Sequence, residues 1–252
     1  MSKKLESPEF KITVGKYVIS EGIEVECFSS KETRSDWCRI ELSSQFQEII
    51  TVNDMAEGIV ELGYDGDFDT LINGNVRLSN DDYWKEIMIK DDMIKLVRTK
   101  VKATFVDCIP QDILKYLLGC ADVKNYILTD EVYDQKKVFV VNNKNCIEAI
   151  KELNSKWGIT NNFFFQDKIF YYGCKKKQET VYVLSESESI LSIQKLGKVW
   201  EIETIGIPWI HHSQEIEVNH SKFSGMVEVA KTIVRSDDKG FVRMFIYFEI
   251  GE

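Results

Sequence analysis

The chain has 252 residues, of which 44% are hydrophobic and 29% are charged, and its net charge at pH 7 is −9. This composition supplies enough apolar residues for one large core or several small ones. Proteins that grip nucleic acid need a basic face to neutralise phosphates, so the acidic balance argues against stable nucleic-acid binding. The basic clusters lie at residues 98–102 and 175–177, and three adjacent lysines beside a strand are typical of a solvated turn.

The N-terminal residues predict no targeting segment. Met1 to Lys4 are followed by Leu-Glu-Ser-Pro without the apolar stretch of a signal peptide. The sequence also lacks an apolar run of the roughly 20 residues that a membrane-spanning helix needs. We therefore expect a chain without a membrane anchor that is made and folded in a cytoplasm.

The first hundred residues predict short strands. Residues 10–14 and 23–27 alternate apolar and polar side chains with a period of two. Further strands are expected at residues 37–42, 59–64, 71–76, 86–90 and 95–97. Short strands with turns at regular spacing indicate a closed barrel or a sandwich.

Two turn signals lie in this region. Asp65-Gly66-Asp67 predicts a turn directly after the strand at residues 59–64. Asn73-Gly74 is typical of a type I′ hairpin turn. Alternatively, Gly74 lies inside a strand and marks a bulge. Both interpretations fit the sequence pattern.

The character of the sequence changes near residue 101, where a strand-like segment at residues 102–107 is followed by a helical pattern. Pro110 stands where a helix can begin, since its missing N–H costs nothing at the first position. Apolar residues then recur at helical spacing, and Gly119 fits a C-terminal cap. The apolar positions of this first helix are Ile113, Leu114, Leu117 and Leu118.

A second helix is expected from Asn145 to Trp157. Asn145 can cap its N-terminus, with Glu148 three residues later in capping-box register, and Gly158 ends it. Residues 162–165 and 169–173, separated by Gln-Asp-Lys, predict a β-hairpin. Residues 101–174 thus predict a compact α/β unit of two helices with strands.

Strands return after residue 175, with a polar break at residues 185–189 and a turn at residues 235–240. They are expected at residues 180–183, 190–193, 199–204, 214–218, 225–229, 233–234 and 241–250. The predicted fold class is therefore mainly β with an α+β insert, in three domains. Residues 1–100 form a first β-barrel, residues 101–174 a small α/β domain, and residues 175–252 a second β-barrel.

The six cysteines and three histidines do not form a recognisable site. No cysteine pair has C-x-x-C spacing, which favours buried free thiols over disulfides or a zinc site. His211, His212 and His220 could meet on a metal, but a polar loop entering a strand is the preferred interpretation. The cysteines are Cys27, Cys38, Cys108, Cys120, Cys146 and Cys174.

Catalytic and ligand-binding motifs fail on inspection. Asp65, Asp67 and Asp69 match the first ligands of a calcium loop, but Thr70 stands where Gly is needed and Val76 where Glu is needed. The sequence contains no nucleophile elbow, Walker loop, zinc-protease motif or dinucleotide fingerprint. We interpret the sequon Asn-His-Ser at residues 219–221 as a chance match. The prediction is a non-enzymatic protein with no catalytic, cofactor or metal site.

The order of elements resembles the baseplate hub proteins of contractile phage tails, the late-control protein family, and the N-terminal hub part of type VI secretion spike proteins. The chain departs from that pattern before the penultimate strand, where many members of the family have a Gly-Asp-x-Val turn and this chain has Ser-Gln-Glu-Ile at residues 213–216. The segments that carry the resemblance are residues 59–76, 91–100, 109–117, 145–158, 163–173 and 223–248.

The resemblance implies an architecture and a set of partners. The two β regions would be tail-tube-like barrels, and three copies would form a pseudo-sixfold ring that adapts the sixfold tube to a threefold spike. Implied partners are the tail tube or tube-initiator protein, a separate spike, baseplate wedge proteins and the tape-measure protein. The particle would be a phage tail or a phage-derived bactericidal tail (a tailocin), and an acidic lumen would let DNA pass without adhesion.

Two other function classes stay open. A tail-associated cell-wall hydrolase predicts a cleft with convergent titratable residues. A carbohydrate- or receptor-binding module predicts an exposed aromatic patch, for which Trp84, Trp200 and Trp209 are candidates. For these tryptophans, a place in a core or a subunit interface is the preferred interpretation.

Overall fold

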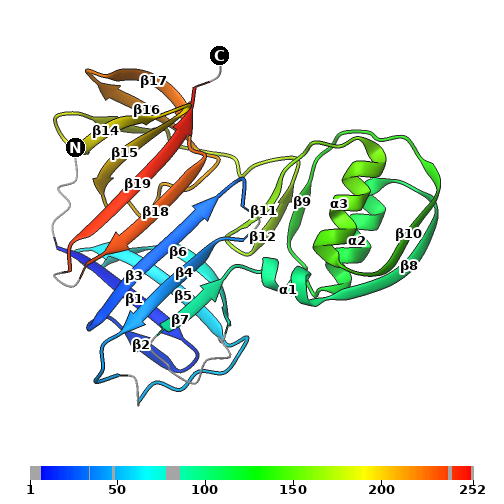
Figure 1. The fold of residues 1–252 in the computed structure, drawn as a ribbon, viewed down its shortest axis with the longest axis horizontal. Helices are drawn as coiled ribbons and strands as arrows, with labels where there is room; N and C mark the ends of the chain where they lie inside the picture. The colour runs from blue at the N-terminus through cyan, green and yellow to red at the C-terminus, as the bar shows by residue number, and fades with distance from the viewer. Residues whose placement is uncertain (1–6, 34, 47–48, 78–85, 238–239, 251–252) are drawn as a thin grey trace. The chain divides into compact units, whose positions relative to one another are not determined.

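The computed structural model describes residues 7–33, 35–46, 49–77, 86–237 and 240–250. The chain is mainly β, as predicted, with three helices among these residues (Figure 1). Its Cα packing divides it into two compact units. We call Met1–Asp91 with Lys177–Glu252 the β unit, and Asp92–Lys176 the α/β unit.

Its described residues give the β unit a sheet of eleven strands and a smaller sheet of three. The strand order in the large sheet is β14-β15-β19-β18-β3-β4-β7-β6-β5-β1-β2, and that in the small sheet is β13-β16-β17. The strands from the N-terminal part are β1 (Pro8–Val14), β2 (Tyr17–Ile19), β3 (Ile23–Ser30), β4 (Trp37–Leu42), β5 (Glu57–Tyr64), β6 (Asp67–Arg77) and β7 (Glu86–Lys90). Those from the C-terminal part are β13 (Tyr182–Ser185), β14 (Ile190–Leu196), β15 (Val199–Ile205), β16 (Glu215–His220), β17 (Phe223–Glu228), β18 (Lys231–Ser236) and β19 (Val242–Glu249).

The large sheet joins the two β regions that the sequence suggested as separate barrels. β3 of the first region pairs antiparallel with β18 of the second, so one ladder runs through both. Within the described residues, no closed barrel is found, because β14 and β2 end the strand order. The arrangement as two tube-like barrels therefore stays a prediction.

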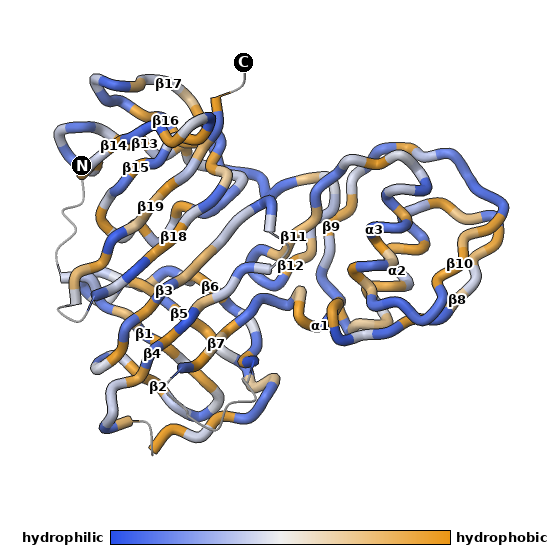
Figure 2. The backbone as a smooth tube through the Cα atoms, viewed as in Figure 1, coloured by the Kyte–Doolittle hydropathy of each residue, from blue (hydrophilic) through white to orange (hydrophobic). Residues whose placement is uncertain are grey.

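Alternating burial along the strands builds one apolar core for the β unit. β1, β4 and β19 each bury every second residue, as the geometry of a strand with one covered face requires. The sequences of β1 and β4 alternate in hydropathy, whereas β19 is mostly hydrophobic (Figure 2). Among the large, fully buried side chains are Ile12, Ile40, Leu62, Ile89 and Phe248. Residues from both β regions belong to this one cluster.

Of the two turns predicted in the first region, the one at Asp65-Gly66 is present. These residues join β5 to β6 with φ of 54° and 80°, the positive values that a type I′ turn requires. Gly74 lies inside β6, opposite Gly58, so the prediction of a hairpin turn there was wrong. The irregularity in this strand pair falls between Val60 and Glu61 rather than at Gly74.

The α/β unit contains three helices, since the predicted strand at residues 95–97 is helical. In α1 (Met93–Arg98), Met93, Ile94 and Leu96 are buried, and the Lys95 ammonium pairs with the Asp92 carboxylate at 2.8 Å. An i, i+3 pair of this kind forms on a helix surface. The other elements are β8 (Lys100–Cys108), α2 (Pro110–Cys120), β9 (Tyr126–Leu128), β10 (Lys136–Asn145), α3 (Cys146–Trp157), β11 (Phe163–Gln166) and β12 (Ile169–Tyr172).

β8 and β10 form an antiparallel two-stranded ribbon, and α2 and α3 cover one face of it (Figure 1). The predicted hairpin of β11 and β12 is confirmed, and β9 adds to it in parallel. Gly119 is not the cap of α2, because the helix continues to Cys120 and the left-handed φ of 54° falls on Asp122. The core of this unit includes Ile113, Leu117, Ile150, Phe170 and Tyr172.

The capping box of α3 is formed as predicted. The Asn145 side chain accepts from the Glu148 backbone N–H at 2.9 Å, and the Glu148 carboxylate accepts from the Asn145 N–H at 3.1 Å. We expect Asn145→Ala to lower the free energy of unfolding of this unit by about 1 kcal/mol. Lys151→Ala, an exposed change on the same helix, is the control and should have little effect in urea denaturation. Equal losses from both would contradict a capping role.

Candidate functional site

The join between the two β regions is held by polar contacts at both ends of the β3–β18 ladder. At one end, Glu26 accepts from Arg235 at 2.6 Å and from Arg39 at 2.9 Å. Next to it, the Ser236 hydroxyl accepts from the Val25 N–H at 2.8 Å. This join places side chains from β3, β4 and β18 in contact although they are far apart in the sequence.

Asp36 organises the other end of the join. Its carboxylate accepts from the Ser29 hydroxyl at 2.6 Å and from the Ser30 N–H at 3.0 Å, both on β3. The backbone N–H of Asp36 donates in turn to the Asp91 carboxylate at 3.1 Å. Asp36 thus ties β3 to the segment that follows β7.

His212 approaches Asp36 from the segment before β16. Its Nε2 lies 3.7 Å from the Asp36 carboxylate, its Nδ1 lies 2.9 Å from the Ser213 hydroxyl, and its side chain is 1% exposed. Burial lowers the pKa of His212 to about 3, and burial raises the pKa of Asp36 to about 7. A histidine this enclosed cannot meet a substrate, so we interpret the group as a polar tie within the core.

A second tie crosses the β unit at Tyr64. Its hydroxyl donates to the Gly206 carbonyl at 2.5 Å, which connects the end of β5 to the segment after β15. Burial raises the pKa of Tyr64 to about 12, so the hydroxyl stays a donor at neutral pH.

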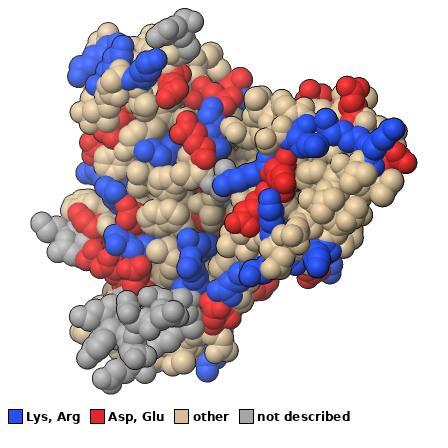
Figure 3. Space-filling model, turned by 45° about the vertical axis from the view of Figure 1, so that its right-hand side comes forward, with Lys and Arg blue, Asp and Glu red and all other residues tan. Residues whose placement is uncertain are grey.

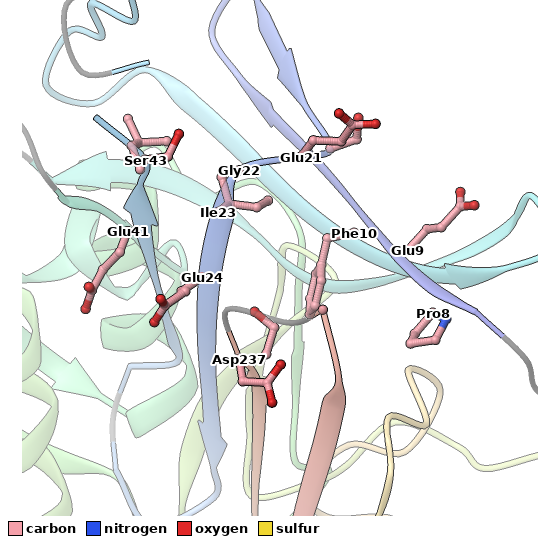
Figure 4. A pocket seen from close by; sticks show the side chains of 14 residues that line it. Pro8, Glu9, Phe10, Glu21, Gly22, Ile23, Glu24, Glu41, Ser43 and Asp237 are labelled. Carbon is pink, nitrogen blue, oxygen red and sulfur yellow. The ribbon is translucent and has the colours of Figure 1, made fainter. Parts of the chain in front are cut away.

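An acidic groove of about 560 Å³ opens on the β unit. Figure 4 shows Glu24 and Glu41 projecting from neighbouring strands, and Glu9, Glu21 and Asp237 around Phe10. The lining residues are Pro8, Glu9, Phe10, Ser20, Glu21, Gly22, Ile23, Glu24, Glu41, Leu42, Ser43, Ser236, Asp237 and Gly240. The groove thus combines a partly apolar floor with five carboxylates, and no lysine or arginine occurs among the described residues that line it.

Glu24 and Glu41 stand directly opposite each other in the β3–β4 ladder. Two like charges in this position destabilise a sheet. Glu41 has a cation near it, the Arg39 guanidinium at 3.6 Å, whereas Glu24 forms no ion pair with a described residue. The groove therefore holds negative charge that the fold does not need for its own stability.

The histidines do not come together on a metal in the described structure. His211 and His212 precede β16, and His220 ends it, with its Nε2 3.6 Å from the Glu186 carboxylate. The interpretation as a polar segment entering a strand is confirmed, except that His212 is buried. Within the described ranges, no group of three potential metal ligands occurs.

The cysteines are free thiols, and four of the six are buried. The expectation of six buried thiols was wrong for Cys120, which is exposed at the end of α2, and for Cys174, which is partly exposed. Burial raises the pKa of Cys146 to about 11, which keeps this thiol protonated.

The tryptophans show no exposed aromatic patch in the described part of the chain. Trp200 packs with Phe223 and Phe248, and Trp209 lies near Tyr182, both against the core. This confirms the core interpretation for these two residues. Trp84 lies outside the described residues.

The sequence predicted neither the polar tie nor the groove. Glu24 and Glu41 stand at outward positions of alternating strands, which indicated solvent exposure but not that the two strands are neighbours. Asp36 and His212 carry no local motif, and only the tertiary fold brings them together.

None of the described helices is long and apolar enough to cross a membrane.

The fold is similar to that of phage tail proteins. A 43 kDa tail protein of prophage MuSo2 from Shewanella oneidensis matches with a TM-score of 0.74 at 12% identity, covering 96% of this chain and 98% of that one. A tail protein from Neisseria meningitidis matches with a TM-score of 0.70 at 8% identity, covering 97% and 96%.

A type VI secretion component from E. coli, described as structurally similar to bacteriophage T4 tail proteins, matches with a TM-score of 0.67 at 12% identity. This likeness covers 96% of the present chain and 77% of that protein. The sequence matches no protein-family model and no curated protein. The resemblance to contractile-tail hub proteins is thus confirmed at the level of the fold.

Proposed function

We propose that this protein is the structural hub of the baseplate of a contractile phage tail or a phage-tail-like particle. The observation that carries the proposal is the likeness in fold to tail proteins over nearly the whole chain. The proposed role is structural, and the buried polar groups at Asp36 and Tyr64 support it because they tie strands together and are enclosed by the fold.

The hub would adapt a sixfold tail tube to a threefold spike. The N-terminal and C-terminal β regions each contribute strands to one sheet and would act as two tube-like modules of one chain. Three copies then present six modules, which matches the tube on one side while keeping threefold symmetry for the spike. The partners would be the tail tube or its initiator, the spike, wedge proteins and the tape-measure protein.

Deleting the gene from the phage or bacterium that encodes the protein tests this role. Without the hub we expect no assembled tails in negative-stain electron micrographs, because the tube lacks its base. Quantitative mass spectrometry of purified wild-type particles should give three copies per tail. Complete, functional tails in the deletion strain would contradict the proposal, and so would a copy number of six.

The hydrolase alternative makes a separate prediction. A hydrolase would clear peptidoglycan in a zymogram of the purified chain, and a hub would not. Clearing that disappears when the groove carboxylates Glu24 and Glu41 are changed to Gln would favour the enzyme.

A further inference from the structure

The two units of the chain carry opposite net charge. The α/β unit has 14 Lys and Arg against 10 Asp and Glu, a net charge of +4. The β unit has 18 against 31, a net charge of −13. A chain with one basic and one acidic part can attract a second copy of itself in a head-to-tail manner.

The basic unit exposes an apolar strip on the β8–β10 ribbon. Val106, Val138 and Val140 are 66%, 51% and 49% exposed, and Val106 stands directly opposite Val138 in the ladder. α2 and α3 cover the other face of the ribbon, where Phe139 and Val141 are buried. Adjacent exposed valines on an uncovered sheet face are typical of an interaction surface.

Lysines border this strip. Lys100 and Lys102 on β8 are exposed and form no ion pair with a described residue. Figure 3 shows, on the right-hand part of the view, an area without charged side chains that has both basic and acidic side chains at its edges. An apolar centre with a charged rim is the usual composition of a protein interface. We call Lys100, Lys102, Thr104, Val106, Val138 and Val140 the ribbon face.

The acidic groove has the complementary composition. Phe10, Ile23 and Leu42 contribute apolar surface to its lining. Glu9, Glu21 and Glu24 are exposed and form no ion pair with a described residue. The opposed pair Glu24 and Glu41 would be relieved by an incoming cation. A twofold contact between two ribbon faces would instead bring lysines against lysines.

We propose that the ribbon face of one copy docks on the acidic groove of a second copy. The contact is heterologous, so it closes into a ring when the rotation between copies allows it. It rests on the proposed hub function for its biological setting, since a ring of copies is what the hub requires. The contact itself is a property of the isolated chain.

Sedimentation and cross-linking of the purified chain test the contact. At low ionic strength and high concentration, the wild type should associate, and added salt should dissociate it because the rim charges are exposed. In a mixture of isotopically labelled and unlabelled chains, a zero-length carbodiimide reagent should join Lys100 or Lys102 to Glu9, Glu21 or Glu24 of another copy. A chain that stays monomeric, or one that gives none of these links between copies, overturns the proposal.

Charge exchange identifies the surfaces. Changing Lys100 and Lys102 to Glu should abolish association, and so should changing Glu9, Glu21 and Glu24 to Lys. Combining both sets in one chain should restore it. The control for the lysine set changes Lys115 and Lys124 to Glu, which alters the net charge equally at exposed positions away from the ribbon face.

Loss of association in the control, or no recovery in the combined variant, would overturn the proposed contact. Circular dichroism verifies folding of each variant. A failure of the proposed contact would leave the hub role untouched, since the deletion experiment tests that role separately. Conversely, a negative deletion experiment would not remove a contact observed with the isolated chain.

Discussion

Gly74→Ala is expected to destabilise the β unit by more than about 3 kcal/mol. A Cβ at this position would overlap the Lys90 carbonyl oxygen and would lie 2.6 Å from the carbonyl carbon. These are backbone atoms, so no side-chain rotation can make room. Since folded domains are stable by only about 5–15 kcal/mol, we expect little folded protein.

The backbone at Lys90 cannot move away easily. Lys90 is the Cα partner of both Trp37 on β4 and Asn75 on β6, and the next residue, Asp91, donates from its N–H to the Asp36 carbonyl at 3.1 Å. A shift of β7 would therefore break pairing on both sides. The close approach of two backbones is the reason for glycine at this position.

Two other glycines provide graded controls. At Gly58, a Cβ would meet the Ile89 side chain at 2.7 Å, which can adjust in part, so we expect a loss of about 1–2 kcal/mol. At Gly119 in α2, nothing lies within 4 Å, and Ala should stabilise the helix by up to about 1 kcal/mol. Urea denaturation of the three variants checks the order. A Gly74→Ala protein as stable as Gly58→Ala would contradict the backbone clash.

The features that the sequence predicted well are those determined by neighbouring residues. The capping box at Asn145 and Glu148 and the Asp65-Gly66 turn depend on a few adjacent positions, and both are present. The prediction of a strand at residues 95–97 was wrong, because a short segment of this kind fits either a strand or a helix. The segment is helical because Met93 and Leu96 are then both buried in the core of the α/β unit.

The features that could not be predicted depend on pairing between distant segments. β3 and β18 have ordinary alternating sequences, and nothing in either specifies the other as its partner. For the same reason, the acidic groove and the Asp36–His212 contact have no local signature. The sequence therefore suggested two separate β regions, whereas the structure joins their strands in one sheet.

Asp36→Asn is expected to change how stability depends on pH. Burial raises the pKa of Asp36 from 3.8 to about 7 in the folded protein, so between these values the folded state binds more protons than the unfolded state. Stability contributed by this group therefore falls as the pH rises through this window and levels off above it, with a slope of up to about 1.4 kcal/mol per pH unit. Asparagine stays neutral and removes this loss.

The introduced asparagine can also keep the contacts of the site. Its amide oxygen can accept from the Ser30 N–H, and its NH₂ group can donate toward His212, which lies 3.7 Å from the carboxylate of the wild type. The other charged groups nearby are Asp91 and the Lys31–Glu228 ion pair, which both proteins retain. Burial lowers the pKa of His212 from 6.5 to about 3, so the unfolded state binds more protons and stability falls as the pH drops below 6.5. This contribution is the same in both proteins and cancels in the difference between their free energies of unfolding.

The measurement is urea denaturation of both proteins from pH 4 to pH 8, followed by tryptophan fluorescence. The free energy of unfolding of Asp36→Asn relative to wild type should rise steadily from pH 4 to about pH 7 and stay constant beyond it, since the buried carboxyl is ionised only at the upper end. Asp65→Asn, at an exposed turn position that asparagine tolerates, should give a difference without this rise. Parallel stability curves for Asp36→Asn and wild type would mean that Asp36 is already ionised at acidic pH, so that its hydrogen bonds outweigh its burial.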